Sequence, residues 1–282
     1  MSEILNITNL TITPKSASNR LLVSNVSLTL SAGKTTCIVG ESGSGKSLTA
    51  LSVMGLLSPQ LQAKGSVKFQ DSELTGLDNR TMQNIRGRKI GMIFQEPMTS
   101  LNPVLTVGYQ IGETLTAHFG LKGTALKDKI AALLTQVGIP AERANSYPDE
   151  LSGGQRQRVM IAMSIACEPV LLIADEPTTA LDVTVQAQIL QLLDQLKTRM
   201  NMAMLFITHD FGVVADIADD VIVMFRGEIV ETGTKKDVLN KPKHPYTKAL
   251  LACVPDAEGK KQLKPIDYAW LKNGLNEKKV AA

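Results

Sequence analysis

TTCIVGESGSGKS, residues 35–47, runs from an apolar segment through three glycines to a lysine and a serine. Its first six residues read as a buried strand and the residues after it as a helix, the setting that the pattern G-x-x-x-x-G-K-[ST] requires. Gly43 and Gly45 let backbone N–H groups point inward as a nest for anionic oxygens, and the helix N-terminus adds partial positive charge. The sequence therefore predicts a phosphate-binding loop in which Lys46 reaches the β- and γ-phosphates of a nucleotide and Ser47 ligates Mg²⁺. The predicted loop residues are Gly40, Glu41, Ser42, Gly43, Ser44, Gly45, Lys46, Ser47 and Leu48.

Hydrophobic periodicity predicts an α/β protein around this loop. Residues 4–12 and 21–30 alternate apolar and polar side chains, which indicates strands with one wet face. Further elements are expected as a hairpin-like region near 65–75, buried strands at 89–95, 170–176 and 203–209, helices at 106–118, 124–137, 184–199 and 211–218, and a hairpin at 221–233 that turns at Arg226-Gly227. Strands that alternate with helices predict a largely parallel sheet with helices on both faces. From about residue 234 the pattern weakens, and about 25 residues at the end are expected to be loosely ordered.

Composition excludes several classes of protein. The chain has 282 residues, 44% of them hydrophobic, and a formal net charge of +3, which fits one large domain or a core with an inserted lobe and gives no dense basic stripe for nucleic acid. The longest strongly apolar segment, Val159–Cys167, is too short to cross a bilayer, which takes about 20 residues. The first ten residues lack the basic start and apolar core of a secretory signal, and three scattered cysteines match no disulfide or zinc pattern. Cys37 and Cys167 are expected in the core, in a reducing compartment.

Two carboxylates end the apolar run VLLIADE at 170–176. In a parallel sheet the C-terminal strand edges line the nucleotide crevice, so Asp175 and Glu176 are expected beside the phosphate loop. Asp175 is predicted to hold the Mg²⁺ sphere. Glu176 is then placed to orient the attacking water or to accept its proton.

A second glycine-rich turn, LSGGQRQR, occupies residues 151–158. Ser152 is a good N-cap for a helix from about Gln155 to Ala166. Gly153 and Gly154 lack Cβ atoms, so their backbone amides can approach a phosphate closely. The turn is therefore a second candidate phosphate-binding element, about a hundred residues after the first.

The motifs GESGSGKS, LSGGQ and ADEPTTALD together resemble the ATP-binding subunit of ABC transporters, and residues 1 to about 255 follow that pattern without a large gap. The resemblance implies an ABC ATPase fold: a P-loop ATPase core with a mostly parallel sheet, N-terminal antiparallel β strands and an inserted helical lobe. It divides the chain into a core with a β subdomain at 1–96 and 166–240, a helical lobe with the signature motif at 97–165, and a C-terminal extension at 241–282. ATP and Mg²⁺ are the implied cofactors.

LSGGQ is the signature motif of that family, and it answers why one chain needs two glycine-rich turns. The resemblance implies that Ser152, Gly153, Gly154 and Gln155 of one subunit close over the γ-phosphate held by the loop of the other subunit. By the same resemblance, Asp182 in TALD is the aspartate that crosses between subunits. The signature residues of this chain are therefore expected to serve a second ATPase chain, identical or different.

Two further residues take roles by resemblance. Gln95 corresponds to the glutamine that senses Mg²⁺ and the attacking water, which makes Ser47, Gln95 and Asp175 the expected metal set. His209 corresponds to the switch histidine that contacts the γ-phosphate. The expected catalytic set is therefore Glu176, His209 and Gln95.

The chain departs from the family pattern where adenine binds. The family stacks adenine on an aromatic residue after the first strand, but the matching positions are Thr13-Pro14 and no aromatic residue precedes Phe69. Such stacking contributes about 1–3 kcal/mol per base, and it is expected to be missing here. Weaker ATP affinity or reduced base discrimination is the expected consequence.

Two segments, EPMTSLNP at 96–103 and KPKHPYTKALLACVPD at 241–256, resemble the oligopeptide, dipeptide and nickel importer branch. That resemblance implies a peripheral subunit on the cytoplasmic face of the inner or plasma membrane, paired with a second ABC ATPase subunit beneath two permeases. An extracytoplasmic solute-binding protein feeds the permeases. Many relatives carry several C-terminal cysteines that bind an iron–sulfur cluster, whereas only Cys253 is present here, so no cluster is expected.

Import of di- or oligopeptides is the favoured function, and import of nickel or a metal chelate is the alternative. A non-transport ABC ATPase acting on DNA or the ribosome usually has two ATPase domains or a long coiled coil between the glycine motifs, and this chain has neither feature. A P-loop kinase or GTPase leaves LSGGQ without a purpose.

Overall fold

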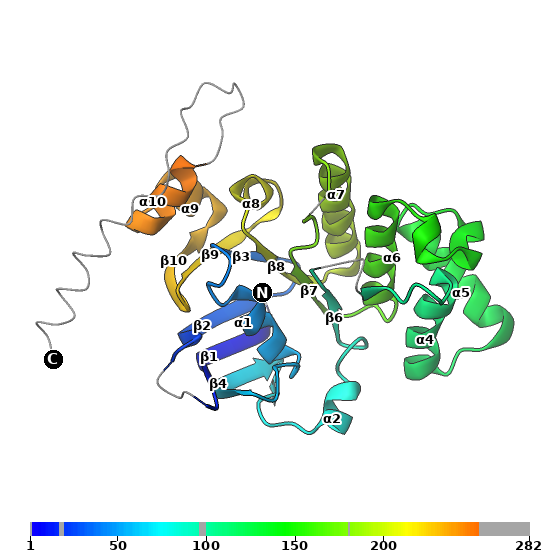
Figure 1. Cartoon of the computed structure of the whole chain (residues 1–282), viewed down its shortest axis with the longest axis horizontal. Coiled ribbons are helices and arrows are strands. Elements are labelled where there is room, and N and C mark those ends of the chain that lie inside the picture. Colours follow the sequence, from blue (N-terminus) through cyan, green and yellow to red (C-terminus); the bar gives the residue numbers. More distant parts are fainter. Residues whose placement is uncertain (1, 17–19, 96–99, 180, 254–282) are drawn as a thin grey trace, which may run out of the picture.

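The computed structural model describes residues 2–16, 20–95, 100–179 and 181–253. Two sheets form the middle of the molecule, a helical lobe lies at one end and the last helices, α9 and α10, lie at the other (Figure 1). The expected end segment, and the start of the lobe at 97, lie outside the described residues.

An antiparallel sheet is built from the N-terminal third of the chain. Its strand order is β2-β1-β4-β5. The bounds are β1 Glu3–Pro14, β2 Val23–Ser31, β4 Leu61–Phe69 and β5 Ser72–Glu73. The predicted strands at 4–12 and 21–30 and the hairpin near 65–75 are confirmed, although β4 begins four residues earlier than the pattern indicates.

The second sheet has six strands in the order β10-β9-β3-β8-β7-β6. All neighbours pair in parallel except β10, which runs antiparallel to β9. The bounds are β3 Thr35–Val39, β6 Ile90–Ile93, β7 Leu171–Asp175, β8 Ala203–Thr208, β9 Asp220–Phe225 and β10 Glu228–Thr234. The hairpin turn falls at Arg226-Gly227, as predicted.

Each central strand divides its side chains between two hydrophobic cores because successive residues point to opposite faces of a sheet. In β7, Leu172 and Ala174 join the core formed with the helices, whereas Leu171 and Ile173 join the core formed with the antiparallel sheet. The second core also includes α1, Lys46–Val53, and the short α2, Asn79–Gln83. A sheet with both faces covered explains why these strands read as continuous apolar runs.

The other face is covered by helices from the lobe and the second half of the chain. Their bounds are α4 Val107–Phe119, α5 Gly123–Gln136, the 3₁₀ turns η1 Ala141–Asn145 and η2 Pro148–Glu150, α6 Gly153–Ile165, α7 Val183–Met200 and α8 Phe211–Ile217. The predicted helices at 106–118, 124–137, 184–199 and 211–218 are confirmed within one residue at each end. Cys37 and Cys167 are buried, as expected.

Up to residue 253, where the described residues end, two helices follow β10 in the part where the sequence pattern weakens. They are α9, Lys235–Asn240, and α10, Pro245–Ala252. The side chain of Thr234 caps α9, which is too short for its periodicity to be read from sequence. Tyr246 of α10 is fully buried in the same core as Phe225 of β9. In the described part of the chain, no helix combines the length and hydropathy needed to cross a bilayer.

Candidate functional site

The loop from Gly40 to Ser47 joins β3 to α1 and is shaped by its glycines. A Cβ atom on Gly40 would lie 2.1 Å from the carbonyl oxygen of Met224, so any larger residue would force the loop away from β9. Gly45, at the start of α1, has φ +100°, a conformation that L side chains rarely adopt. The loop therefore opens the N-terminus of α1 toward a ligand, where backbone N–H groups and the helix dipole favour an anion.

Lys46 is buried at the first position of α1, with only 4% of its surface exposed. Its Nζ donates hydrogen bonds to the carbonyl oxygens of Gly40, at 2.7 Å, and Glu41, at 2.9 Å. Burial lowers the pKa of Lys46, and nearby carboxylates, led by Glu176, oppose that change. Because water reaches this ammonium poorly, an anionic ligand would supply the compensation that solvent does not.

Ser47 and Asp175 face each other between α1 and the end of β7. The Ser47 hydroxyl donates a 3.0 Å hydrogen bond to Oδ1 of Asp175. Burial raises the pKa of Asp175, and the charge of Glu176 adds to that effect, whereas the Ser47 hydrogen bond and the charge of Lys46 oppose it. A hydroxyl and a carboxylate are hard oxygen donors of the kind that Mg²⁺ prefers, so the pair fits the predicted metal role.

We expect Asp175→Asn to raise the unfolding temperature of the nucleotide-free chain at neutral pH. A carboxyl whose folded-state pKa is raised contributes stability at low pH that is lost as the pH rises through that pKa, so its ionised form costs stability. Removing the charge should add about 1–3 °C, the shift typical of small gains in domains of this size. Thermal unfolding checks this against Asp149→Asn, an exposed carboxylate in η2. A fall in the unfolding temperature of Asp175→Asn would contradict the assignment.

Glu176 follows β7 directly and has a left-handed backbone, with φ +47°. Its N–H donates to the carbonyl oxygen of Ile207 on β8, at 2.9 Å, which fixes the turn. Its Oε2 accepts hydrogen bonds from Nε2 of Gln95, at 3.3 Å, and Oγ1 of Thr179, at 2.9 Å, and lies 3.2 Å from Nδ1 of His209. The structure therefore brings together the three predicted catalytic residues from three different strand ends.

Thr179 was not singled out from the sequence. It stands three residues after Glu176 in EPTT, a spacing at which a hydroxyl can reach back to a carboxylate, but that spacing alone is common. The structure identifies Thr179 because the turn after β7 brings its hydroxyl to the Glu176 carboxylate.

We expect Thr179→Val to slow ATP hydrolysis about three- to tenfold while leaving the affinity for ATP unchanged, because it removes one hydrogen bond that orients Glu176. Phosphate release and equilibrium binding of ATP measure the two quantities separately. Thr179→Ser keeps the hydroxyl and should retain most of the activity. An unchanged rate in Thr179→Val would remove Thr179 from the site.

Residues of the phosphate loop, together with Gln95 and Glu176, line one small cavity of about 140 Å³. Its walls are Ser42, Gly43, Gly45, Lys46, Ser47, Leu48, Gln95 and Glu176. Gly40 and Ser44 are buried behind it, and Glu41 is half-buried. The loop, Gln95 and Glu176 therefore share one site, although they come from segments far apart in the chain, and His209 contacts that site through Glu176.

The signature turn does not line this cavity. Oγ of Ser152 accepts the N–H of Gln155, at 3.3 Å, and Oε1 of Gln155 accepts the N–H of Ser152, at 3.0 Å. This reciprocal cap starts α6 at Gly153, two residues before the expected start. Gly153 and Gly154 are therefore the first turn of a helix, whose N-terminal end is exposed at Ser152 and Gly153.

The two signature positions, 153 and 154, favour glycine for different reasons. A Cβ on Gly154 would lie 2.7 Å from Cγ1 of Val185 on α7, so this glycine is required by close helix packing. Gly153 has only Leu181 near its Cβ position, at 3.9 Å, so it keeps the helix end open. Asp182 caps α7 through a 2.9 Å hydrogen bond from the N–H of Val185, the residue whose side chain lies against Gly154.

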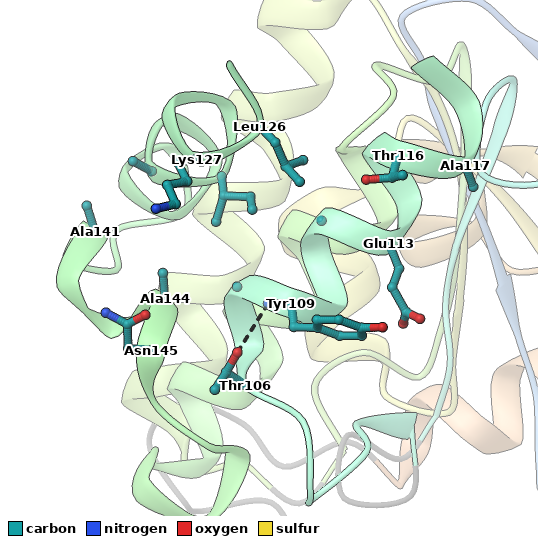
Figure 2. A pocket seen from close by; sticks show the side chains of 14 residues that line it. Thr106, Tyr109, Glu113, Thr116, Ala117, Leu126, Lys127, Ala141, Ala144 and Asn145 are labelled. Atoms are coloured by element: carbon teal, nitrogen blue, oxygen red, sulfur yellow. Dashed lines mark hydrogen bonds between the residues drawn. The ribbon is translucent and has the colours of Figure 1, made fainter. Parts of the chain in front are cut away.

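Larger cavities lie away from the phosphate loop, and two of them involve the lobe helices α4 and α6. The first, of about 830 Å³, is an open pocket lined by α4, α5 and η1 of the lobe, with Tyr109, Glu113 and Lys127 on its walls (Figure 2). A second, of about 270 Å³, has walls from both the core and the lobe. Its lining includes Met54 and Phe94 from the core side and Thr114 and Met163 from the lobe side. The second cavity therefore lies where residues of the core sheet and its loops meet helices of the lobe.

A family model described as "ABC transporter" matches residues 23–179 of this chain. The chain belongs to the ABC transporter family. A second model, described as "Oligopeptide/dipeptide transporter, C-terminal region", matches residues 230–270. The dipeptide transport ATP-binding protein DppD of Bacillus subtilis is 48% identical, over 95% of this chain and 82% of the relative. DppD of Haemophilus influenzae is 50% identical, over 86% of this chain and 75% of the relative.

Among solved ABC structures, a dimeric post-hydrolysis state of the ATP-binding cassette MJ0796 with ADP and Pi is similar to this chain, with a TM-score of 0.73 and 30% identity over 82% of this chain and 99% of that one. The predicted ABC ATPase fold is therefore confirmed, with its antiparallel N-terminal sheet and mostly parallel core sheet. The chain is an ATP-binding ABC ATPase that works in transport.

Proposed function

We propose that this chain is the ATP-hydrolysing subunit that energises the import of di- or oligopeptides through partner membrane permeases. The observation that carries the substrate class is the second family match, because the peptide-transporter C-terminal region aligns with residues 230–270, outside the general ATPase match. The names of the most similar relatives support the same class. Nickel or metal-chelate import is the alternative, and no observation favours it.

In the proposed reaction, the phosphates of ATP bind at the N-terminus of α1, where Lys46 and the loop amides neutralise their charge. Glu176 orients the attacking water and accepts its proton. The hydrogen bonds that the described residues donate to its carboxylate fall on Oε2, from Gln95 and Thr179, and Nδ1 of His209 faces the same oxygen. Holding one oxygen fixes the direction of the other, Oε1, toward a water beside the γ-phosphate.

Mg²⁺ is the proposed metal, with Ser47 and Asp175 as its protein ligands and Gln95 at the edge of the same site. When bound with ATP, Mg²⁺ neutralises charge on the β- and γ-phosphate oxygens. The buried Asp175 carboxylate, held by Ser47, is the residue that this chain contributes to its position.

A second ATPase chain is proposed to complete the site. Ser152, Gly153, Gly154 and Gln155 lie outside the cavity that holds the phosphate loop, yet the exposed start of α6 presents backbone N–H groups suited to an anion. In a head-to-tail pair, the start of α6 of each chain would cover the γ-phosphate on the other chain. Asp182, at the adjoining start of α7, would lie at that junction.

The cavity between the core and the lobe is the proposed binding site for a permease segment. Phe94, which immediately precedes Gln95, lies on its wall and is 41% exposed. A segment bound there would contact both the core and the lobe, so closure around ATP would move it. The larger cavity within the lobe has walls from the lobe alone, so a segment bound there would not contact the core (Figure 2).

Two permease subunits would hold the ATPase at the cytoplasmic face of the membrane, and an extracytoplasmic binding protein would deliver the peptide. The test is uptake of a radiolabelled dipeptide by source cells from which the gene has been deleted. Uptake should fall and be restored by the wild-type chain and by Glu142→Gln, an exposed carboxylate in η1, but not by Glu176→Gln. Normal dipeptide uptake together with lost nickel uptake would instead support the alternative.

A further inference from the structure

We propose that Tyr246, on the C-terminal helix α10, is a positioning residue for nucleotide binding. It acts by holding the peptide group whose carbonyl oxygen accepts the Lys46 ammonium. The inference rests on the proposed role of the loop as the ATP site. It gives the C-terminal segment a part in ATP affinity that no local motif predicts.

The contact joins residues 205 positions apart in the chain. The backbone N–H of Glu41 donates a 3.1 Å hydrogen bond to the Tyr246 hydroxyl. That N–H belongs to the same planar peptide group as the carbonyl oxygen of Gly40, which accepts Lys46 Nζ at 2.7 Å. Tyr246 therefore holds one edge of the peptide plane and Lys46 the opposite edge. Rotation of this peptide would break both contacts together.

The Tyr246 hydroxyl is itself held in place firmly. Its ring is fully buried and packs on Phe225 of β9, with ring centroids 4.3 Å apart and planes tilted by 43°. The N–H of Tyr246 donates to Nδ1 of His244 at 3.1 Å, which caps the start of α10. A ring fixed by packing and by its own helix presents its hydroxyl at one position, so the hydrogen bond to Glu41 is pre-organised.

The start of α10 is in turn anchored to the core sheet. The carboxylate of Glu231 on β10 accepts the N–H groups of Lys243, at 2.7 Å, and His244, at 3.0 Å. The same β9–β10 hairpin holds the other side of the phosphate loop, because the N–H of Gly227 donates to the carbonyl oxygen of Ser44 at 3.0 Å. The β9–β10 hairpin and α10 therefore hold the phosphate loop by hydrogen bonds at two places, Glu41 and Ser44.

Tyr246→Phe tests this role because it keeps the ring on Phe225 and removes only the hydroxyl acceptor from the Glu41 N–H. We expect the Kd for ATP with Mg²⁺ to rise about three- to tenfold, the cost of one partly buried hydrogen bond. In the assembled transporter the KM for ATP should rise by the same factor while kcat stays within about twofold, because Glu176 is untouched. Tyr109→Phe, on an exposed lobe tyrosine, is the matched control and should change neither.

A second variant, Glu231→Gln, weakens the anchor of α10 without altering the tyrosine, so a smaller rise of about twofold is expected. Hydrogen exchange at the Glu41 amide adds a direct readout, which should quicken in Tyr246→Phe before any global unfolding. An unchanged Kd and unchanged exchange at Glu41 would overturn the inference even if the variant were less stable. If the wild-type chain itself failed to bind ATP, the proposed function would fail instead.

Discussion

Glu176→Gln is expected to lower ATP hydrolysis by about a hundredfold or more while ATP remains bound. The amide has nearly the shape of the carboxylate, and its oxygen can still accept from Gln95 and Thr179 at the position of Oε2. What it lacks is the capacity to accept a proton from the attacking water. The variant should therefore still bind ATP but fail to hydrolyse it, so the nucleotide-bound form accumulates.

The measurement is phosphate release by the tagged chain isolated with its transporter partners, with bound nucleotide quantified in the same sample. Glu142→Gln provides the matched exchange at an exposed carboxylate outside the site. Wild-type rates of phosphate release in Glu176→Gln would show that another group orients the water.

Lys46→Ala is expected to weaken ATP binding by about a hundredfold. The ammonium is buried among the loop carbonyls of Gly40 and Glu41, and no other lysine or arginine of the described residues lines the cavity to replace it. The loss includes both the charge on the phosphates and the internal tie that shapes the loop. The effect should therefore exceed that of removing any single neutral hydrogen bond in the site.

Equilibrium binding of ATP with Mg²⁺ measures this loss directly. Lys129→Ala removes a partly exposed lysine of α5 that pairs with Glu168, and it should bind ATP like the wild type. A Lys46→Ala chain that binds ATP normally would mean that the loop is not the nucleotide site.

Local patterns predicted the elements that build the site. GESGSGKS requires a strand before it and a helix after it, and VLLIADE ends a buried strand in two carboxylates, so both motifs carry their own structural context. Gln95 and His209, whose roles the family resemblance implies, lie beside Glu176 because each follows a strand of one parallel sheet. Parallel strand order brings such ends to a common edge.

What the sequence did not predict depends on contacts between distant residues. The bond between Glu41 and Tyr246 joins the first and last parts of the described chain, and no periodicity in either segment indicates it. The need for glycine at position 154 arises from Val185 on a neighbouring helix, whereas the sequence suggested only access to phosphate. The division of the chain into domains at 97, 166 and 241 remains a prediction. Tyr246, which lies beyond the boundary at 241, packs in the hydrophobic core between the second sheet and its helices.

In the proposed function two ATPase chains enclose ATP, and residues 152–155 of each chain cover the phosphate loop of the other. Native mass measurement of tagged Glu176→Gln chains, isolated from their source cells with and without ATP and Mg²⁺, tests it most directly. We expect ATP to yield a complex with two ATPase chains and two bound ATP molecules, the second chain being either a copy of this one or a different ABC ATPase. A single ATPase chain that holds ATP with no second ATPase bound would contradict it.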